Sequence, residues 1–314
     1  MAIELGPDVA ASDLPGAKEK GAAFVQQLEE AGLLTTTAEG LMVLTRYTHL
    51  LLEGADAADR AEAARLLSPL VNEPEHILAV DQEAGEQVLL EAMYLQLLEG
   101  RPEEVLAIAE VFTAGGLAEP DAATDVVARW AHYTTEALLQ MGRSEEAVAL
   151  AWQVLNTHAD LTRGRRNELL LFIASAYERE NRLQEALDVL TPMLTDQQPR
   201  RSVDAFWVFM THMQAGRCRV KLEQFAEAAA LLQQATAIMD QWPATVPFDG
   251  PVFTWVWLGE AEEGRGNRKA AQEAFSTALT NLQDACDTGR LPEEMRAGVG
   301  DRLESRIARL EAAE

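Results

Sequence analysis

Six helix-breaking positions recur along this 314-residue chain at nearly constant intervals, and this spacing limits the folds that it can adopt. Each position lies between two segments whose apolar residues repeat every three or four residues, which is the period of an α-helix. The positions are Gly54, Gly100, Gly142, Asn181, Glu223 and Gly266, and the successive intervals are 46, 42, 39, 42 and 43 residues. Intervals of this length are typical of repeat arrays, in which each helix pair buries its apolar faces only against its neighbours.

The periodic segments predict an all-α fold, because the alternating pattern of β-strands is almost absent. We expect six antiparallel helix pairs at 37–53/56–71, 83–99/102–114, 120–141/144–157, 163–180/183–195, 201–222/225–241 and 250–264/267–287. One helix at about 16–32 precedes the pairs and another at about 291–312 follows them. We interpret residues 1–15 as a flexible N-terminus and residues 16–314 as a single helical-repeat domain.

The last pair has small and bulky residues at fixed distances from its turn: Trp255, Leu258, Gly259, Gly266, Ala271, Phe275 and Ala278. This pattern resembles the tetratricopeptide repeat (TPR), in which small residues let two helices approach and large residues fill the gaps around them. Weaker matches occur in the three preceding pairs, so the resemblance covers about residues 83–287.

The chain departs from this family in two respects. Its intervals near 42 residues exceed the usual ~34, which resembles the longer-helix variants of bacterial regulatory and peptide-receptor arrays. Arg219 and Glu262 also occupy positions where the family prefers an aromatic residue. The resemblance implies a TPR-like, right-handed α-solenoid that holds another molecule on its concave face.

The charge balance is strongly acidic, with 26 Lys and Arg against 51 Asp and Glu. Binding to phosphates needs clustered basic residues, so we expect neither nucleic acid nor a membrane surface as a partner. Cys218 and Cys286 match no metal-binding spacing and fit a reducing compartment. The N-terminus lacks the basic and apolar segments of a signal peptide, and no apolar run is long enough to span a membrane. These features favour the cytoplasm.

No motif for catalysis or cofactor binding is visible. His132 and Glu136 lie four residues apart on one helix face and could supply two metal ligands, but a third ligand is missing, and a polar helix face is the simpler interpretation. The Gly-rich segments 264–266 and 298–300 follow no strand, so they do not predict a phosphate site. We therefore expect no enzyme activity, no metal and no cofactor.

Two first helices are apolar on nearly every side, in the segments 205–210 and 253–258. A solenoid helix needs an apolar stripe only toward its partner and its neighbours. The additional apolar residues are either covered by another part of the chain, or they line a groove for a protein segment. Aromatic residues and methionines such as Met210 and Met213 are common anchors in such grooves.

Residues 160–221 contain 10 Lys and Arg against 8 Asp and Glu, whereas the remainder of the chain contains 16 against 43. Arg163, Arg165 and Arg166 lie where one first helix begins, and Arg200 and Arg201 lie where the next one begins. A stacked array would place both groups along one edge. They are either solvated loop residues or part of a binding surface.

The C-terminal segment has apolar residues at spacings of three and four: Met295, Val299, Leu303, Ile307 and Leu310. Terminal repeats need a polar outer face, so we expect this segment to cover the flank of the last pair.

The function that these observations favour is a scaffold that binds a protein or peptide segment. Its candidate contacts are Trp207, Met210, Met213, Arg217, Trp257, Arg163, Arg166, Arg200 and Arg201. Some family members grip a C-terminal carboxylate through Lys and Asn residues of the first helices. We do not expect such a clamp here, because these helices offer Glu, Met and Leu but few Lys. The alternative is an effector-sensing regulatory module, for a small ligand or a signal peptide, that acts through a partner. The oligomeric state is left open.

Overall fold

The computed structural model describes residues 16–54, 57–72, 74–114, 124–195, 202–243, 246, 249–288 and 290–312, and within these ranges every regular element is helical. The N-terminus that we interpreted as flexible, residues 1–15, lies outside the described residues. The helices group into two compact units, Met1–Leu161 and Thr162–Glu314. The predicted all-α fold is confirmed, whereas a single domain over 16–314 stays a prediction.

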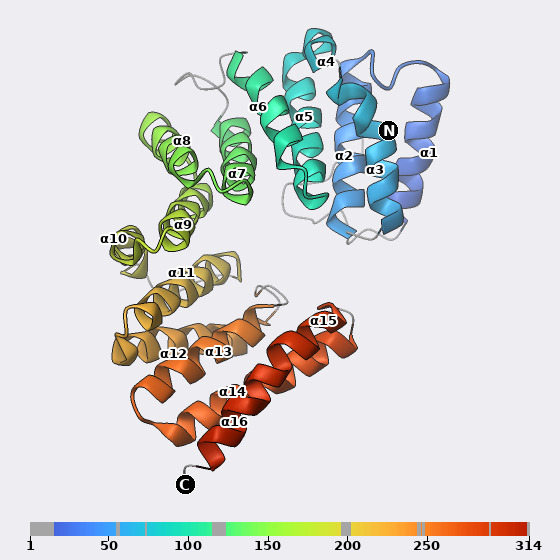
Figure 1. The fold of residues 1–314 in the computed structure, drawn as a ribbon. Helices are drawn as coiled ribbons and strands as arrows, with labels where there is room; N and C mark the ends of the chain where they lie inside the picture. The colour runs from blue at the N-terminus through green and yellow to red at the C-terminus, as the bar shows by residue number, and fades with distance from the viewer. Residues whose placement is uncertain are drawn as a thin grey trace. The chain divides into compact units, whose positions relative to one another are not determined.

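Unit 1 contains a flanking helix, three helix pairs and one short helix (Figure 1). These are α1 (Ala17–Glu30), α2 (Ala38–Gly54), α3 (Ala57–Val71), α4 (Pro74–Val80), α5 (Gln82–Leu98), α6 (Pro102–Ala114), α7 (Thr124–Gln140) and α8 (Ser144–Thr157). The pairs are α2/α3, α5/α6 and α7/α8, and the first helices α2, α5 and α7 also pack side by side. The pairs therefore stack as in an α-solenoid.

Unit 2 repeats this arrangement with three further pairs. Its helices are α9 (Arg163–Arg179), α10 (Leu183–Leu194), α11 (Ser202–Lys221), α12 (Phe225–Gln241), α13 (Gly250–Gly264), α14 (Arg268–Asp287), α15 (Glu293–Met295) and α16 (Asp301–Glu311). The first helices α9, α11 and α13 pack side by side, and α10 and α12 each also pack on the first helix that follows. The six predicted helix pairs are thus all found.

Two elements differ from the prediction. The short helix α4 was not expected, because seven residues are too few to show a helical period; Pro74 begins it and Ile77 is buried. The C-terminal segment forms the predicted helix and is helical without a break over residues 293–311, but part of it is not α-helical. A π-helical turn (Arg296–Gly300) separates α15 from α16, in a stretch where Gly298 and Gly300 lower the helix propensity.

The turns inside five pairs share one backbone geometry. One residue in each turn has a positive φ: 68° at Gly100, 74° at Gly142, 58° at Asn181, 58° at Glu223 and 75° at Gly266. Its N–H donates to the carbonyl oxygen three residues earlier, and the next N–H donates to the carbonyl oxygen five residues earlier. These two hydrogen bonds form a Schellman motif, which ends the first helix. The predicted break positions are confirmed here.

Replacing Glu223 by glycine should stabilise the chain by about 0.5–1 kcal/mol, because a side chain at positive φ is strained. The Glu223 side chain is exposed, so little packing is lost. Thermal denaturation measures the effect. As a control, Gly266→Ala at the equivalent position should destabilise the chain by about 1 kcal/mol. Equal melting temperatures for wild type and Glu223→Gly would contradict this account.

Two buried positions, one on each helix of a pair, have complementary sizes. They lie seven residues before and nine residues after the positive-φ residue, and their occupants are Met93/Ala109, Thr135/Ala151, Ala174/Leu190, Gly216/Leu232 and Gly259/Phe275. A Cβ added at Gly216 would lie 2.6 Å from Cγ of Leu232, and one at Gly259 would lie 2.5 Å from Cε1 of Phe275. The glycines therefore make room for the large side chains, as predicted for Gly259.

In the last three pairs, the position four residues before the turn residue holds a side chain that contacts the residue after the turn. Oε2 of Glu262 accepts a hydrogen bond from Nδ2 of Asn267 at 3.1 Å. Arg219 donates to Oε1 of Gln224, and the guanidinium of Arg182 lies 4.4 Å from the ring centroid of Tyr177. Glu262 and Arg219 therefore occupy the predicted register, and polar contacts replace the aromatic residue that the family prefers.

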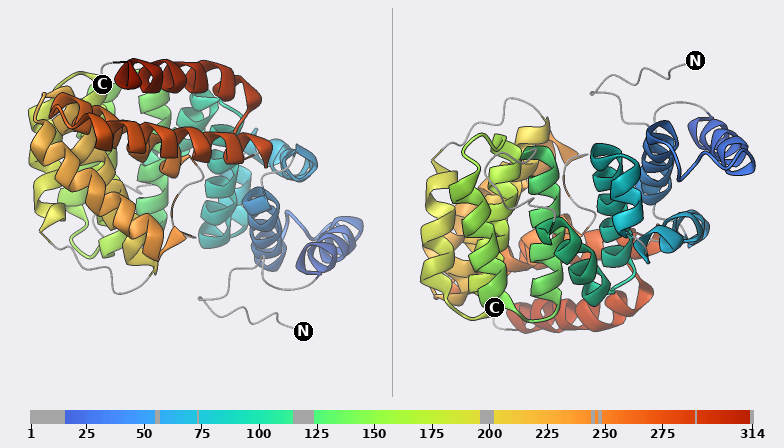
Figure 2. Two further views of the ribbon diagram at one scale, coloured as in Figure 1. Left: turned by 90° about the horizontal axis from the view of Figure 1, so that it is seen from below. Right: turned by 90° about the horizontal axis from the view of Figure 1, so that it is seen from above.

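Helix α16 covers the flank of the last pair, as the sequence predicts. It lies along α14 (Figure 2), and Leu303 and Leu310 are buried in a cluster with Phe275. Arg306 and Arg309 form ion pairs with acidic residues of α13. The last pair therefore has a charged cover over its apolar flank.

Candidate interaction surface

One face of the first helices from α5 to α13 carries three side chains at equivalent positions, 13, 9 and 6 residues before the turn residue. Because these spacings are three and four, the three side chains of each helix share one face. We call the face formed by these residues the ladder face. In unit 1 it comprises Gln87, Glu91 and Tyr94 of α5 and Arg129, Tyr133 and Glu136 of α7. In unit 2 it comprises Glu168, Phe172 and Ser175 of α9, Met210, Gln214 and Arg217 of α11, and Phe253, Trp257 and Glu260 of α13. Most of these side chains are partly exposed; Glu91 and Gln214 are buried.

A buried carboxylate organises the ladder face of unit 1. The side chain of Glu91 is only 2% exposed, and its Oε1 accepts a hydrogen bond from Nη2 of Arg129 at 2.6 Å. Its Oε2 lies 3.3 Å from Nδ1 of His49 on α2. Arg129 also donates through Nη1 to Oε1 of Gln87 at 2.9 Å. The carboxylate therefore links three first helices.

Aromatic rings flank this network. The rings of Tyr94 and Tyr133 are stacked, with centroids 5.7 Å apart, and the guanidinium of Arg129 lies 5.9 Å from the Tyr133 centroid. His132 meets Tyr133 edge to face, and its Nε2 lies 3.5 Å from Oε2 of Glu136. The predicted His132–Glu136 pair is thus present. The sequence analysis did not single out the remainder of this network, whose members look like ordinary polar helix residues.

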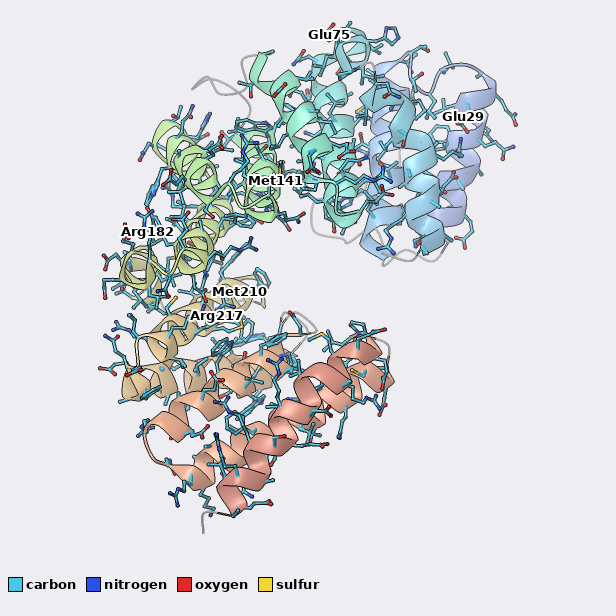
Figure 3. All side chains as sticks on the ribbon, viewed as in Figure 1. Glu29, Glu75, Met141, Arg182, Met210 and Arg217 are labelled. Atoms are coloured by element: carbon cyan, nitrogen blue, oxygen red, sulfur yellow. The ribbon has the colours of Figure 1, made fainter. Side chains whose placement is uncertain are left out.

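A second carboxylate links α9 and α11 in unit 2. Glu178 is 6% exposed at its side chain and pairs with Arg217 at 2.5 Å and with Lys221 at 2.6 Å. Beside this contact, Nε2 of Gln214 donates to Oγ of Ser175 at 2.9 Å. Arg217, a predicted contact residue, lies on the ladder face of α11 together with Met210 (Figure 3), and one of its nitrogens is engaged within the chain.

The apolar contact residues of unit 2 are neither fully open nor fully covered. Trp207 and Met210 are partly buried and pack on a cluster formed by α9, α10 and α11. Met213 packs on a cluster that also contains Phe209, and Trp257 packs on one that contains Leu258. Met210 also packs on the cluster of Phe209, and the indole Nε1 of Trp207 lies near Gly164, 3.4 Å from the position of an added Cβ. Their role in binding stays a prediction.

The arginine group at the start of α9 differs in exposure from one residue to the next. Arg163 is exposed and Arg166 is partly buried, while Arg165 donates to Oε2 of Glu168 at 3.1 Å. Thr162 caps this helix by accepting a hydrogen bond from the Arg165 N–H. Arg200 and Arg201 lie outside the described residues, so the predicted edge formed by the two groups is not tested.

The remaining side chains that could react or bind a metal do not cluster in the described residues. In the described part of the chain, no three His, Cys, Asp or Glu side chains come together as metal ligands. Burial raises the pKa of the Cys218 thiol to about 12 and lowers the pKa of His212, so neither group is ionised near neutral pH. None of the helices in these ranges is long and apolar enough to cross a membrane.

Comparisons with known proteins give a distant structural similarity. No family model matches the chain, and no curated protein matches it. Similar solved structures include two of the nearly identical TPR-like repeats of a putative kinesin light chain from Podosopora anserina, one of them a variant. Both are 20% identical to this chain and cover 65% of it; the chain covers 95% and 96% of theirs, with TM-scores of 0.48 and 0.47. Similarity at this level indicates no function.

Proposed function

We propose that this chain is an interaction scaffold whose ladder face binds a segment of another protein. The observation that carries the proposal is the recurrence of partly exposed Tyr, Trp, Phe, Met and Arg side chains on one face of successive first helices. These residue types are enriched where proteins bind one another. Because the first helices of each unit pack side by side, a segment lying across them meets several such side chains at once.

In unit 2 the apolar anchors are Met210 and Trp257 of the ladder face and Met213 of α11, three residues after Met210, with Arg217 as a polar contact. A partly exposed Met or Trp offers apolar area that a partner can still cover, and a buried anchor contributes about 2 kcal/mol or more to binding. Arg217 keeps donors beyond the one that it gives to Glu178, since a guanidinium has five. Trp207 contributes as much to packing as to the surface, so its replacement is a poor test of binding.

The experiment compares two methionines that pack on the same cluster from different helices. Met210 lies on the ladder face, whereas Met193 lies on the second helix α10, and both pack on the same core cluster. Met210 also packs on a second cluster that contains Phe209, so Met210→Ala should lose somewhat more stability, and capture is compared at a temperature at which both variants are folded. Only Met210→Ala should weaken capture of a partner from native lysate, by about tenfold or more.

Quantitative capture and a thermal melt are measured on both variants and on Trp257→Ala. Equal loss of partner in Met193→Ala and Met210→Ala would trace the effect to stability and contradict the proposal. If no protein is captured and a small molecule from the lysate raises the melting temperature instead, the chain is an effector-sensing module and the scaffold proposal is wrong.

A further inference from the structure

Exposed apolar side chains gather near the start of the described chain. Phe24, Leu33 and Met42 are 41%, 44% and 48% exposed, and all three lie on α1, on α2 or between them. At the other end of the chain, α16 places charged residues over the flank of the last pair. Exposed apolar patches on a folded chain commonly mark contact surfaces.

The orientation of α1 is fixed by its inner face. Val25 is buried, and a Cβ added at Gly21 would lie 2.7 Å from Cδ2 of Tyr47, so α1 lies close against α2. The ends of the helix are held to α3: Lys18 pairs with Asp59, and Arg65 donates to Glu29 at 3.0 Å. The opposite face of α1 therefore points away from the unit.

The outer face of α1 has a pattern that is complementary to itself. Lys20, Ala23, Phe24, Gln27 and Glu30 are all exposed, and their spacing places them on one side of the helix. When the same helix is laid antiparallel about residue 25, each Lys20 faces Glu30 of the other copy, and each Ala23 faces Gln27. Phe24 lies beside the two-fold axis, and the small Ala23 lets the two helices approach.

We propose that two copies of the chain associate through this face as a two-fold symmetric dimer with antiparallel α1 helices. A two-fold contact uses the same patch on both copies, so the pair of Lys20 with Glu30 of the other copy forms twice. Residues 1–161 contain 28 Asp and Glu against 8 Lys and Arg, so the copies repel one another at long range, and about 150 mM salt is needed to screen this repulsion.

Sedimentation equilibrium of the full chain tests the dimer directly. The wild type should form dimers at concentrations up to about 100 µM in 150 mM NaCl. Phe24→Glu should abolish them. Lys20→Glu and Glu30→Lys should each weaken the dimer by about tenfold or more, since each places two like-charge pairs in the contact. The double variant Lys20→Glu/Glu30→Lys should restore dimerisation, because the exchanged charges are complementary again.

Matched controls make the same charge changes elsewhere. Lys269→Glu and Glu304→Lys are exposed substitutions outside unit 1 and should leave the dimer unchanged. A wild type that stays monomeric at the highest concentration would overturn the proposal. This holds even if the monomer binds a different protein through Phe24. Failure of the double variant to recover would likewise overturn it, since a contact in another register gains nothing from the exchange.

Discussion

Arg129→Ala is expected to destabilise unit 1 by about 3 kcal/mol, because it leaves a buried carboxylate without its main partner. The Glu91 side chain is 2% exposed and Arg129 is 14% exposed, so water replaces the lost contact poorly. His49 keeps the carboxylate from being fully unpaired, which limits the loss. Chemical denaturation with a fluorescence readout measures the change.

The double variant Arg129→Met/Glu91→Leu separates two contributions to stability. One is the free-energy cost of leaving the Glu91 carboxylate unpaired, and the other is the net contribution of the Glu91–Arg129 ion pair. Replacing a buried ion pair by apolar residues of similar size is commonly neutral or stabilising. We therefore expect the double variant to be more stable than Arg129→Ala. If both variants lose the same stability, the network stabilises through packing and not through the charge of Glu91.

Gly259→Leu is expected to cost about 3 kcal/mol, at the upper end of the range for overpacking a core. A Cβ alone would lie 2.5 Å from the Phe275 ring, so the added side chain must push α13 and α14 apart. Thermal denaturation checks this result. Gly298→Ala serves as a control, because a Cβ at Gly298 meets nothing within 4 Å.

The chain itself suggests a compensating change. The pair α9/α10 has Ala174 and Leu190 at the positions of Gly259 and Phe275. Gly259→Ala should therefore destabilise the Phe275→Leu variant less than it destabilises the wild type. We expect a coupling of about 1 kcal/mol in a double-mutant cycle. Additive effects of the two substitutions would contradict the complementary packing of these positions.

The candidate surface was only partly predictable from sequence. Met210, Met213 and Trp257 stand out because their helices carry more apolar residues than a solenoid core needs. Glu91 and Arg129 do not stand out, since charged residues on a helix usually face solvent. Their distance from the turn gives no signal either, because the equivalent positions of the other repeats hold different types of residue.

The exposed face of α1 could not be predicted from the sequence either. Alanines and Phe24 on one helix predict burial as readily as exposure, and only the contacts of Gly21 and Val25 with the unit show which side faces inward. Similarly, the charge balance changes near residue 160, but a change in charge does not by itself show that the helices divide into two compact units at Leu161.

The sequence by itself determined the repeat, the helix pairs and the turns, because these depend on residues that lie close together along the chain. A positive φ at Gly142 or Gly266 and the size match of Gly259 with Phe275 are set within one helix pair. Tertiary structure decided which side chains meet between pairs, as Glu91 meets Arg129 and Ser175 meets Gln214. Those contacts join residues about forty positions apart and depend on the rotation of each helix about its axis. The period of the apolar residues fixes that rotation only to within a broad stripe.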